Sequence, residues 1–128
     1  MTYYLRTWGD PALRRRCRPV SEFSDLDGLI SSMQYIIDNK PGLGIAAPQV
    51  GDDRQILIAR IDGEAKLFVN PQIKKARCYI ATLEGCLSLP KLTLPKIRRF
   101  RIDLEYQTKS GNKKSETFSG LNAIVLQH

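Results

Sequence analysis

The stretch Gly42-Leu-Gly-Ile-Ala-Ala-Pro-Gln-Val-Gly51 decides the fold, and it also holds the first candidate for a functional residue. Its early glycines allow positive φ or close backbone approach, and its small alanines leave room for a neighbour. Gln49 is a lone amide in an apolar setting, so burying it requires a hydrogen-bond partner. The residues alone leave two interpretations open, a turn into a strand or a ligand-facing loop. A phosphate-binding loop is disfavoured, because no Lys-Ser/Thr pair follows the glycines.

Two later segments carry side chains suited to chemistry. In Glu84-Gly-Cys-Leu-Ser-Leu-Pro90 a cysteine stands between a glycine and a strand-like run, where it is a small buried residue, a nucleophile or a metal ligand. Gly120-Leu-Asn-Ala-Ile-Val-Leu-Gln-His128 ends on the one histidine of the sequence. A nucleophilic thiolate needs a base and a metal needs several ligands, so His128 is the available histidine partner for either role of Cys86.

Apolar periodicity around these segments predicts an α+β domain. Between Ser24 and Asn39 apolar residues recur at helical spacing, with Ser24 as the expected N-cap. Asp10-Pro-Ala-Leu13 predicts a short helical start. Alternation and turn residues predict strands at 55–61, 66–70, 76–83, 99–106 and 115–118, with a bend at Asn70-Pro71. We expect a single domain over residues 1–128, with helices first and last and antiparallel strands between them.

Composition narrows the class of protein. The 128 residues include 42% apolar and 26% charged residues, which is ordinary for a globular chain. No apolar run approaches the roughly 18 residues of a membrane span. Three cysteines without paired spacing argue against a disulfide framework. The net charge of +7 comes largely from basic runs at 14–18 and 96–101, which are either solvated faces or surfaces attracted to RNA.

In combination and in this order, the three segments resemble the signature of the peptide deformylases. That family carries Gly-x-Gly-x-Ala-Ala-x-Gln, then Glu-Gly-Cys-x-Ser, then a helix with Gln-His-Glu-x-x-His. The first motif stands here at 42–49, the second at 84–88, and the third only as Gln127-His128. The resemblance covers essentially the whole chain. It implies an α+β fold in which antiparallel strands surround a central C-terminal helix that carries the metal-binding His.

The resemblance implies a metal-dependent hydrolase that removes the formyl group from formylmethionine at the start of new peptides. One divalent metal, Fe²⁺ or Zn²⁺ with Ni²⁺ also used in the family, is held by one Cys and two His. By this resemblance Cys86 is the thiolate ligand and His128 is the first imidazole. The Gln49 amide and the Leu87 backbone N–H would stabilise the oxyanion that forms on the formyl carbonyl.

The same resemblance suggests the residues that bind the peptide. The backbone of Gly44 should pair with the extended substrate, and Arg98 matches a family arginine near its far end. Glu84 is expected to orient local backbone. The side chains expected to line the methionine pocket are Leu43, Leu87 and Val125.

The third motif is also where this sequence departs from the family. The Glu that follows the first His and the second His one turn later do not stand after His128. Two hypotheses follow from the sequence. In one, the chain as given is a C-terminally truncated part of an active enzyme. In the other, it is a catalytically dead, deformylase-like binding module. Ile124, where the family usually has Arg, is a smaller departure.

The expected partner is an N-formylmethionyl peptide, with a weak ribosome contact through the basic runs. No sequence-specific nucleic-acid binding and no membrane attachment are expected. The chain is expected to be monomeric and cytoplasmic (in the host cytoplasm if phage-encoded, and an organelle is also compatible). A rival hypothesis, a basic RNA-binding domain, predicts RNA affinity that falls steeply with salt but gives no role to Gln49 or Cys86.

Overall fold

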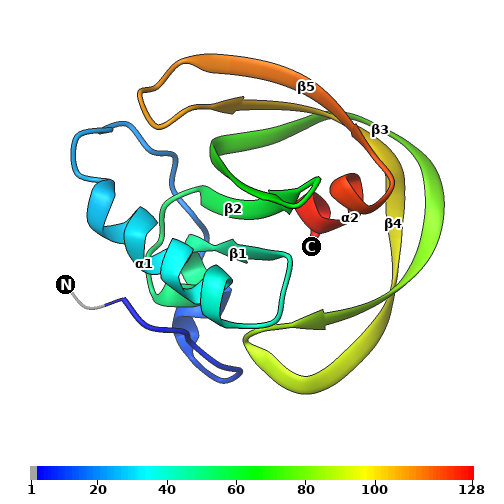
Figure 1. Cartoon of the computed structure of the whole chain (residues 1–128), viewed down its shortest axis with the longest axis horizontal. Helices are drawn as coiled ribbons and strands as arrows, with labels where there is room; N and C mark the ends of the chain where they lie inside the picture. Colours follow the sequence, from blue (N-terminus) through cyan, green and yellow to red (C-terminus); the bar gives the residue numbers. More distant parts are fainter. Residues whose placement is uncertain (1–2) are drawn as a thin grey trace.

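An antiparallel sheet in which every strand pairs with its neighbours in sequence is the framework of the fold (Figure 1). The computed structural model describes residues 3–128 and, for residues 89–92 and 94, the backbone only. In spatial order the strands are β1 (Gly44–Ala46), β2 (Ile56–Ile61), β3 (Glu64–Cys86), β4 (Leu89–Gln107) and β5 (Lys113–Ser119). The predicted turn at Asp62-Gly63 is present, and both residues have positive φ, as a tight hairpin turn requires.

Strands β3 and β4 form one long curved ribbon that passes around the C-terminal helix α2 (Leu121–Gln127; Figure 1). The bend predicted at Asn70-Pro71 is wrong. The β3–β4 register shifts between Val69 and Gln72, so these residues form a bulge and the strand continues. Asn70 has a φ of 50° and is fixed by its side chain, whose Oδ1 accepts from Val20 N at 2.7 Å while Nδ2 donates to Val20 O at 2.9 Å.

Helix α1 (Asp27–Asn39) begins two residues later than the sequence predicted, because its N-cap position is residue 26 and not 24. The Ser24 N-cap is wrong, because its hydroxyl donates to Glu22 instead. Leu26 occupies the N-cap position without a side-chain cap and is fully buried. Burial of this leucine in the core therefore sets where the helix begins. The short helical start after Asp10 is confirmed as a 3₁₀ turn (Pro11–Arg14), in which the Asp10 carboxylate accepts from Ala12 N at 2.9 Å.

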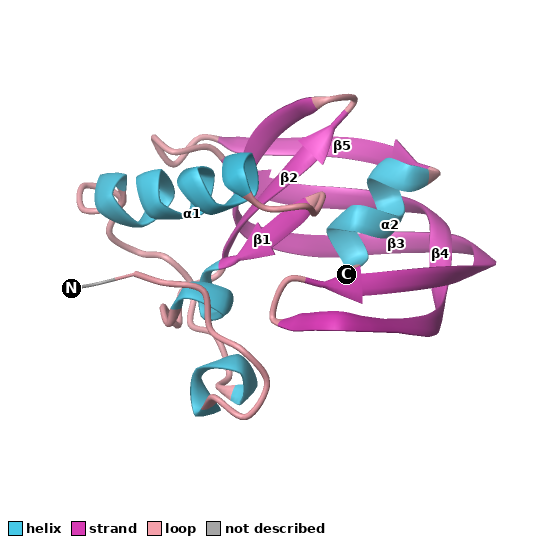
Figure 2. Cartoon of the chain, turned by 60° about the horizontal axis from the view of Figure 1, so that its bottom comes forward, coloured by secondary structure: helices cyan, strands magenta, loops and turns pink. Residues whose placement is uncertain are grey.

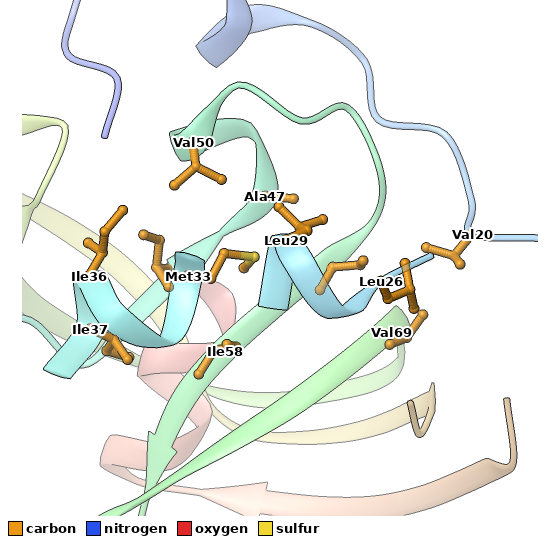
Figure 3. Close-up of a cluster of buried hydrophobic side chains, with 12 residues drawn as sticks. Val20, Leu26, Leu29, Met33, Ile36, Ile37, Ala47, Val50, Ile58 and Val69 are labelled. Carbon is orange, nitrogen blue, oxygen red and sulfur yellow. The ribbon is translucent and has the colours of Figure 1, made fainter. Parts of the chain in front are cut away.

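Strand β2 contributes to two separate cores, one for each helix. Ile56 and Ile58 pack with α1, and the alternate residue Ala59 packs in the cluster of α2. Figure 3 shows Ile58 beneath Met33 and the other α1 side chains, and Figure 2 shows the two helices packed separately against the sheet. An α+β fold with an antiparallel sheet and a C-terminal helix is confirmed. No helix within residues 3–128 is long and apolar enough to span a membrane.

Ile58→Val should lower the free energy of unfolding by about 0.5–1.5 kcal/mol, because it deletes one methyl group from a side chain that is 1% exposed. Urea denaturation followed by circular dichroism measures the change. The matched control is Ile73→Val, which removes the same group from a side chain that is 46% exposed and should change stability by less than about 0.5 kcal/mol. Equal effects of both substitutions would contradict the placement of this core.

Candidate active site

Helix α2 is anchored to β4 by the residue that precedes His128. The Gln127 side chain accepts from Arg99 N at 2.8 Å and donates to Arg99 O at 2.6 Å and to Ala123 O at 2.9 Å. Ala123 is fully buried, which brings the helix close to the sheet. These contacts fix the end of the helix, so the position of His128 is determined by the β4 backbone.

The cleft beside this helix has a volume of about 870 Å³ and gathers most of the predicted site residues. It is lined by β1, by the end of β3 and by α2. The predicted residues that line it are Leu43, Gly44, Gln49, Cys86, Leu87, Val125 and His128. Arg98 is not among the lining residues that the structure describes. The three sequence segments, which are far apart along the chain, therefore meet at one cleft.

Gln49 is held with its amide group toward the cysteine loop. Its Oε1 accepts from Ala46 N at 2.9 Å, so the carbonyl end is satisfied by backbone. Its Nε2 lies 3.2 Å from Ser88 Oγ and 3.7 Å from Cys86 Sγ. The bond to backbone fits the interpretation of a turn into a strand, and the ligand-facing role of Gln49 stays a prediction. The fixed carbonyl leaves Nε2 directed toward Ser88 and Cys86, at the end of the cleft that holds the cysteine.

Glu84 lies at the centre of a polar cluster that the sequence did not predict. Its carboxylate accepts from Arg98 Nη2 at 2.9 Å and Nε at 3.0 Å, and it also accepts from Thr82. His128 Nδ1 lies 2.6 Å from Glu84 Oε1. The hydrogen bonds from Arg98 lower the pKa of Glu84 to about 2, against the effect of burial, so the carboxyl group is ionised at neutral pH. The substrate contact predicted for Arg98 stays a prediction, because this guanidinium is engaged by Glu84.

Strand β1 has one edge paired with β2 and presents its other side to the cleft. The glycine before it is required by a close neighbour and by its φ, whereas a Cβ at the glycine within it would make only an ordinary contact. A Cβ at Gly42 would lie 3.2 Å from Leu87 Cγ, and its φ of 153° disfavours other residues. A Cβ at Gly44 would lie 3.4 Å from Val125 Cγ1. The open edge is the type of surface to which an extended peptide adds as a further strand.

Two of the side chains at this cleft carry donor atoms that suit a divalent metal. Within residues 3–128 no group of three or more His, Cys, Asp and Glu side chains could hold a metal ion. Cys86 and His128 nevertheless offer a sulfur and an imidazole nitrogen, which are ligands that Zn²⁺ and Fe²⁺ accept. With Nδ1 on the Glu84 carboxylate, His128 keeps Nε2 for a metal, which is the arrangement typical of ligating histidines. These residues fit as two members of a ligand set.

A thiol, an imidazole and an oriented amide donor around one cleft are the groups of a mononuclear metal hydrolase. A family model described as "Polypeptide deformylase" matches residues 3–128. A peptide deformylase from Thermus thermophilus is 34% identical, with 100% of this chain and 76% of the relative covered. One from Thermotoga petrophila is also 34% identical, with 98% and 78% covered.

Solved structures agree with this match. The crystal structure of peptide deformylase from Thermotoga maritima has a TM-score of 0.95 at 33% identity, covering 100% of this chain and 88% of that one. A peptide deformylase from Legionella pneumophila has a TM-score of 0.93 at 30% identity, covering 100% and 78%. The chain belongs to the polypeptide deformylase family, whose members are metal-dependent hydrolases. The relatives give no support to the alternative of a catalytically dead binding module.

Proposed function

We propose that the cleft carries out deformylation with one divalent metal, Fe²⁺ or Zn²⁺, of whose protein ligands Cys86 and His128 would supply two. The observation that carries this proposal is that Gln49, Cys86, Leu87 and His128 line one cleft beside the open edge of β1. The bound metal supplies Lewis acidity and makes water acidic enough to provide hydroxide near neutral pH.

The residues around the metal ligands bind and polarise the formyl group. The Gln49 N–H donors and the Leu87 backbone N–H stabilise the negative charge that develops on the formyl oxygen. Because the Gln49 carbonyl is already bonded to Ala46 N, this amide does not have to reorganise during the reaction. The ionised Glu84 carboxylate accepts a hydrogen bond from His128 Nδ1, which orients the ring so that Nε2 is the nitrogen available to a metal.

The peptide that follows the formyl group is bound by β1 and by an apolar pocket. We propose that the Gly44 backbone pairs with the extended peptide and that the methionine side chain contacts Leu43, Leu87 and Val125. These three side chains are apolar and line the cleft, and Leu43 is 43% exposed. An apolar lining suits methionine, which is flexible and has no charge.

Gln49→Leu is expected to lower kcat/KM for a formyl-Met-Ala-Ser peptide by roughly 100-fold or more, as loss of one oxyanion donor does in other hydrolases. Formate release from the metal-loaded protein measures the rate. Gln72→Leu, the same change at an exposed strand position, is the control and should leave the rate unchanged. Full activity of the Gln49 variant would remove Gln49 from the mechanism, and absence of formate release by the parent protein would overturn the proposed function.

We further propose that the protein works as a cytoplasmic monomer and that its net charge of +7 gives weak attraction to the ribosome. Such attraction is electrostatic, so it should weaken steeply as salt is raised.

A further inference from the structure

Lys40 lies at the end of the cleft where α1 finishes. Its backbone N–H caps the helix by donating to Ile36 O at 3.0 Å, so its main chain is fixed. The residue is exposed and lines the cleft together with Pro41 and Gly42. The side chain therefore extends from a rigid base at the rim of the cleft.

The charge of Lys40 is not neutralised within the described part of the chain. Besides Cys86, the charged or titratable residues that line the cleft are Lys40, Glu84 and His128. Glu84 is already paired with Arg98 and is in contact with His128. The neighbouring Asp38 accepts from Arg60 and Gln34. No ion pair between described residues includes Lys40, so an ammonium group without a carboxylate partner lies at the rim.

The direction of β1 indicates where a peptide bound along this strand would pass Lys40. Ala46 is the end of β1 nearest the catalytic groups, because its N–H donates to the Gln49 side chain. Lys40 lies six positions earlier, at most about 20 Å away along an extended chain. A peptide that starts at Gln49 and pairs along β1 runs toward the end of the cleft that Lys40 lines, so we expect its third or fourth residue within reach of the long lysine side chain.

We infer that Lys40 makes this enzyme prefer formylated peptides with an acidic side chain at the third or fourth position. The inference rests on the proposed function, since it requires the peptide to start at Gln49. Formylation removes the N-terminal charge of a peptide, so the charges near the cleft are those of the side chains that follow methionine. A solvent-exposed pair of this kind contributes modestly, and it should change KM rather than kcat because Lys40 is remote from the formyl group.

The test compares formyl-Met-Ala-Asp-Asp, formyl-Met-Ala-Ser-Ser and formyl-Met-Ala-Lys-Lys as substrates. At low salt, KM should be about three- to fivefold lower for the Asp peptide than for the Ser peptide, and higher again for the Lys peptide. Lys40→Glu should reverse this order, and Lys40→Met should remove it. High salt should also reduce the differences. Lys113→Glu makes the same change in net charge on β5, at the opposite edge of the sheet from β1, and should keep the parent order.

Three results overturn the inference, and they distinguish failure of the Lys40 role from failure of the proposed function. If all peptides are hydrolysed with equal KM by the parent and by Lys40→Glu, the role of Lys40 is wrong while the proposed function stands. The same conclusion follows if Lys113→Glu shifts the order as much as Lys40→Glu, because the effect then belongs to the overall charge. If even the Ser peptide releases no formate, the proposed function fails and the inference falls with it.

Discussion

Cys86→Ala is expected to abolish deformylation and to reduce bound metal to background. Loss of a supporting contact alone lowers metal affinity roughly 10- to 100-fold, and loss of the thiolate itself should exceed that. Without the metal, no group lining the described cleft can supply comparable Lewis acidity to the formyl group. Elemental analysis of the purified protein measures metal content, and formate release measures the reaction.

A second cysteine provides the control for this substitution. Cys78 is exposed on β3, away from the residues that line the cleft, and Cys78→Ala should retain both metal and activity. A Cys86→Ala protein that kept its full metal content would show that the thiol is not a ligand. Equal losses in both variants would point to general damage of the protein rather than to the site.

Arg98→Met should lower the free energy of unfolding by about 1–3 kcal/mol, because it removes the guanidinium that pairs with the Glu84 carboxylate. The Glu84 side chain is 9% exposed at the wall of the cleft, so water and Thr82 replace the guanidinium only in part. Chemical denaturation measures the change. Arg77→Met is the matched control, since it breaks an arginine–aspartate pair whose side chains are 50% and 31% exposed, and it should cost no more than about 1 kcal/mol.

The loss of stability at acidic pH is a second test of the ion pair between Glu84 and Arg98. The folded protein holds the pKa of Glu84 at about 2, below its ordinary value of 4.5. A carboxyl group with a lowered pKa stabilises the fold above its unfolded pKa, and this contribution is lost as pH falls from about 4.5 toward 2. The parent protein should therefore lose stability across this range more steeply than Arg98→Met does. Parallel curves would contradict the pairing.

Local patterns in the sequence predicted the helix of residues 27–39 and the turn at Asp62-Gly63 well. They failed where distant contacts decide the outcome. Asn70-Pro71 has the composition of a turn, but the two hydrogen bonds between the Asn70 side chain and the Val20 backbone hold it in a bulge of a continuing strand. Leu26 begins α1 because it is buried by the tertiary core, which no capping pattern reveals.

The catalytic motifs predicted which residues gather at the cleft but missed the ion pair beneath them. The predicted strands stopped at residue 83 and resumed at 99, so Glu84 and Arg98 both fell outside them. In the structure both belong to the β3–β4 ribbon, on the same face as the opposed pair Thr82 and Lys96. Extending the two strands by one residue each would have included both residues, but the register of the pair, which the sequence pattern did not predict, is what places the opposite charges on one face. The roles proposed for the remaining site residues, and the single domain over residues 1–128, stay predictions.

The order of the strands also suggests in which order the parts of the site form during synthesis of the chain. Because β1 to β5 pair in sequence order, each strand finds its partner among residues already made, and such local pairing favours rapid folding. The helix that carries His128 follows all five strands and docks on β4 through Gln127. Because Cys86 precedes His128 in the chain, we expect the thiol to reach its place on the ribbon before the imidazole does. We expect metal capture to be a late event in maturation, which follows closure of the helix onto a sheet that is already formed.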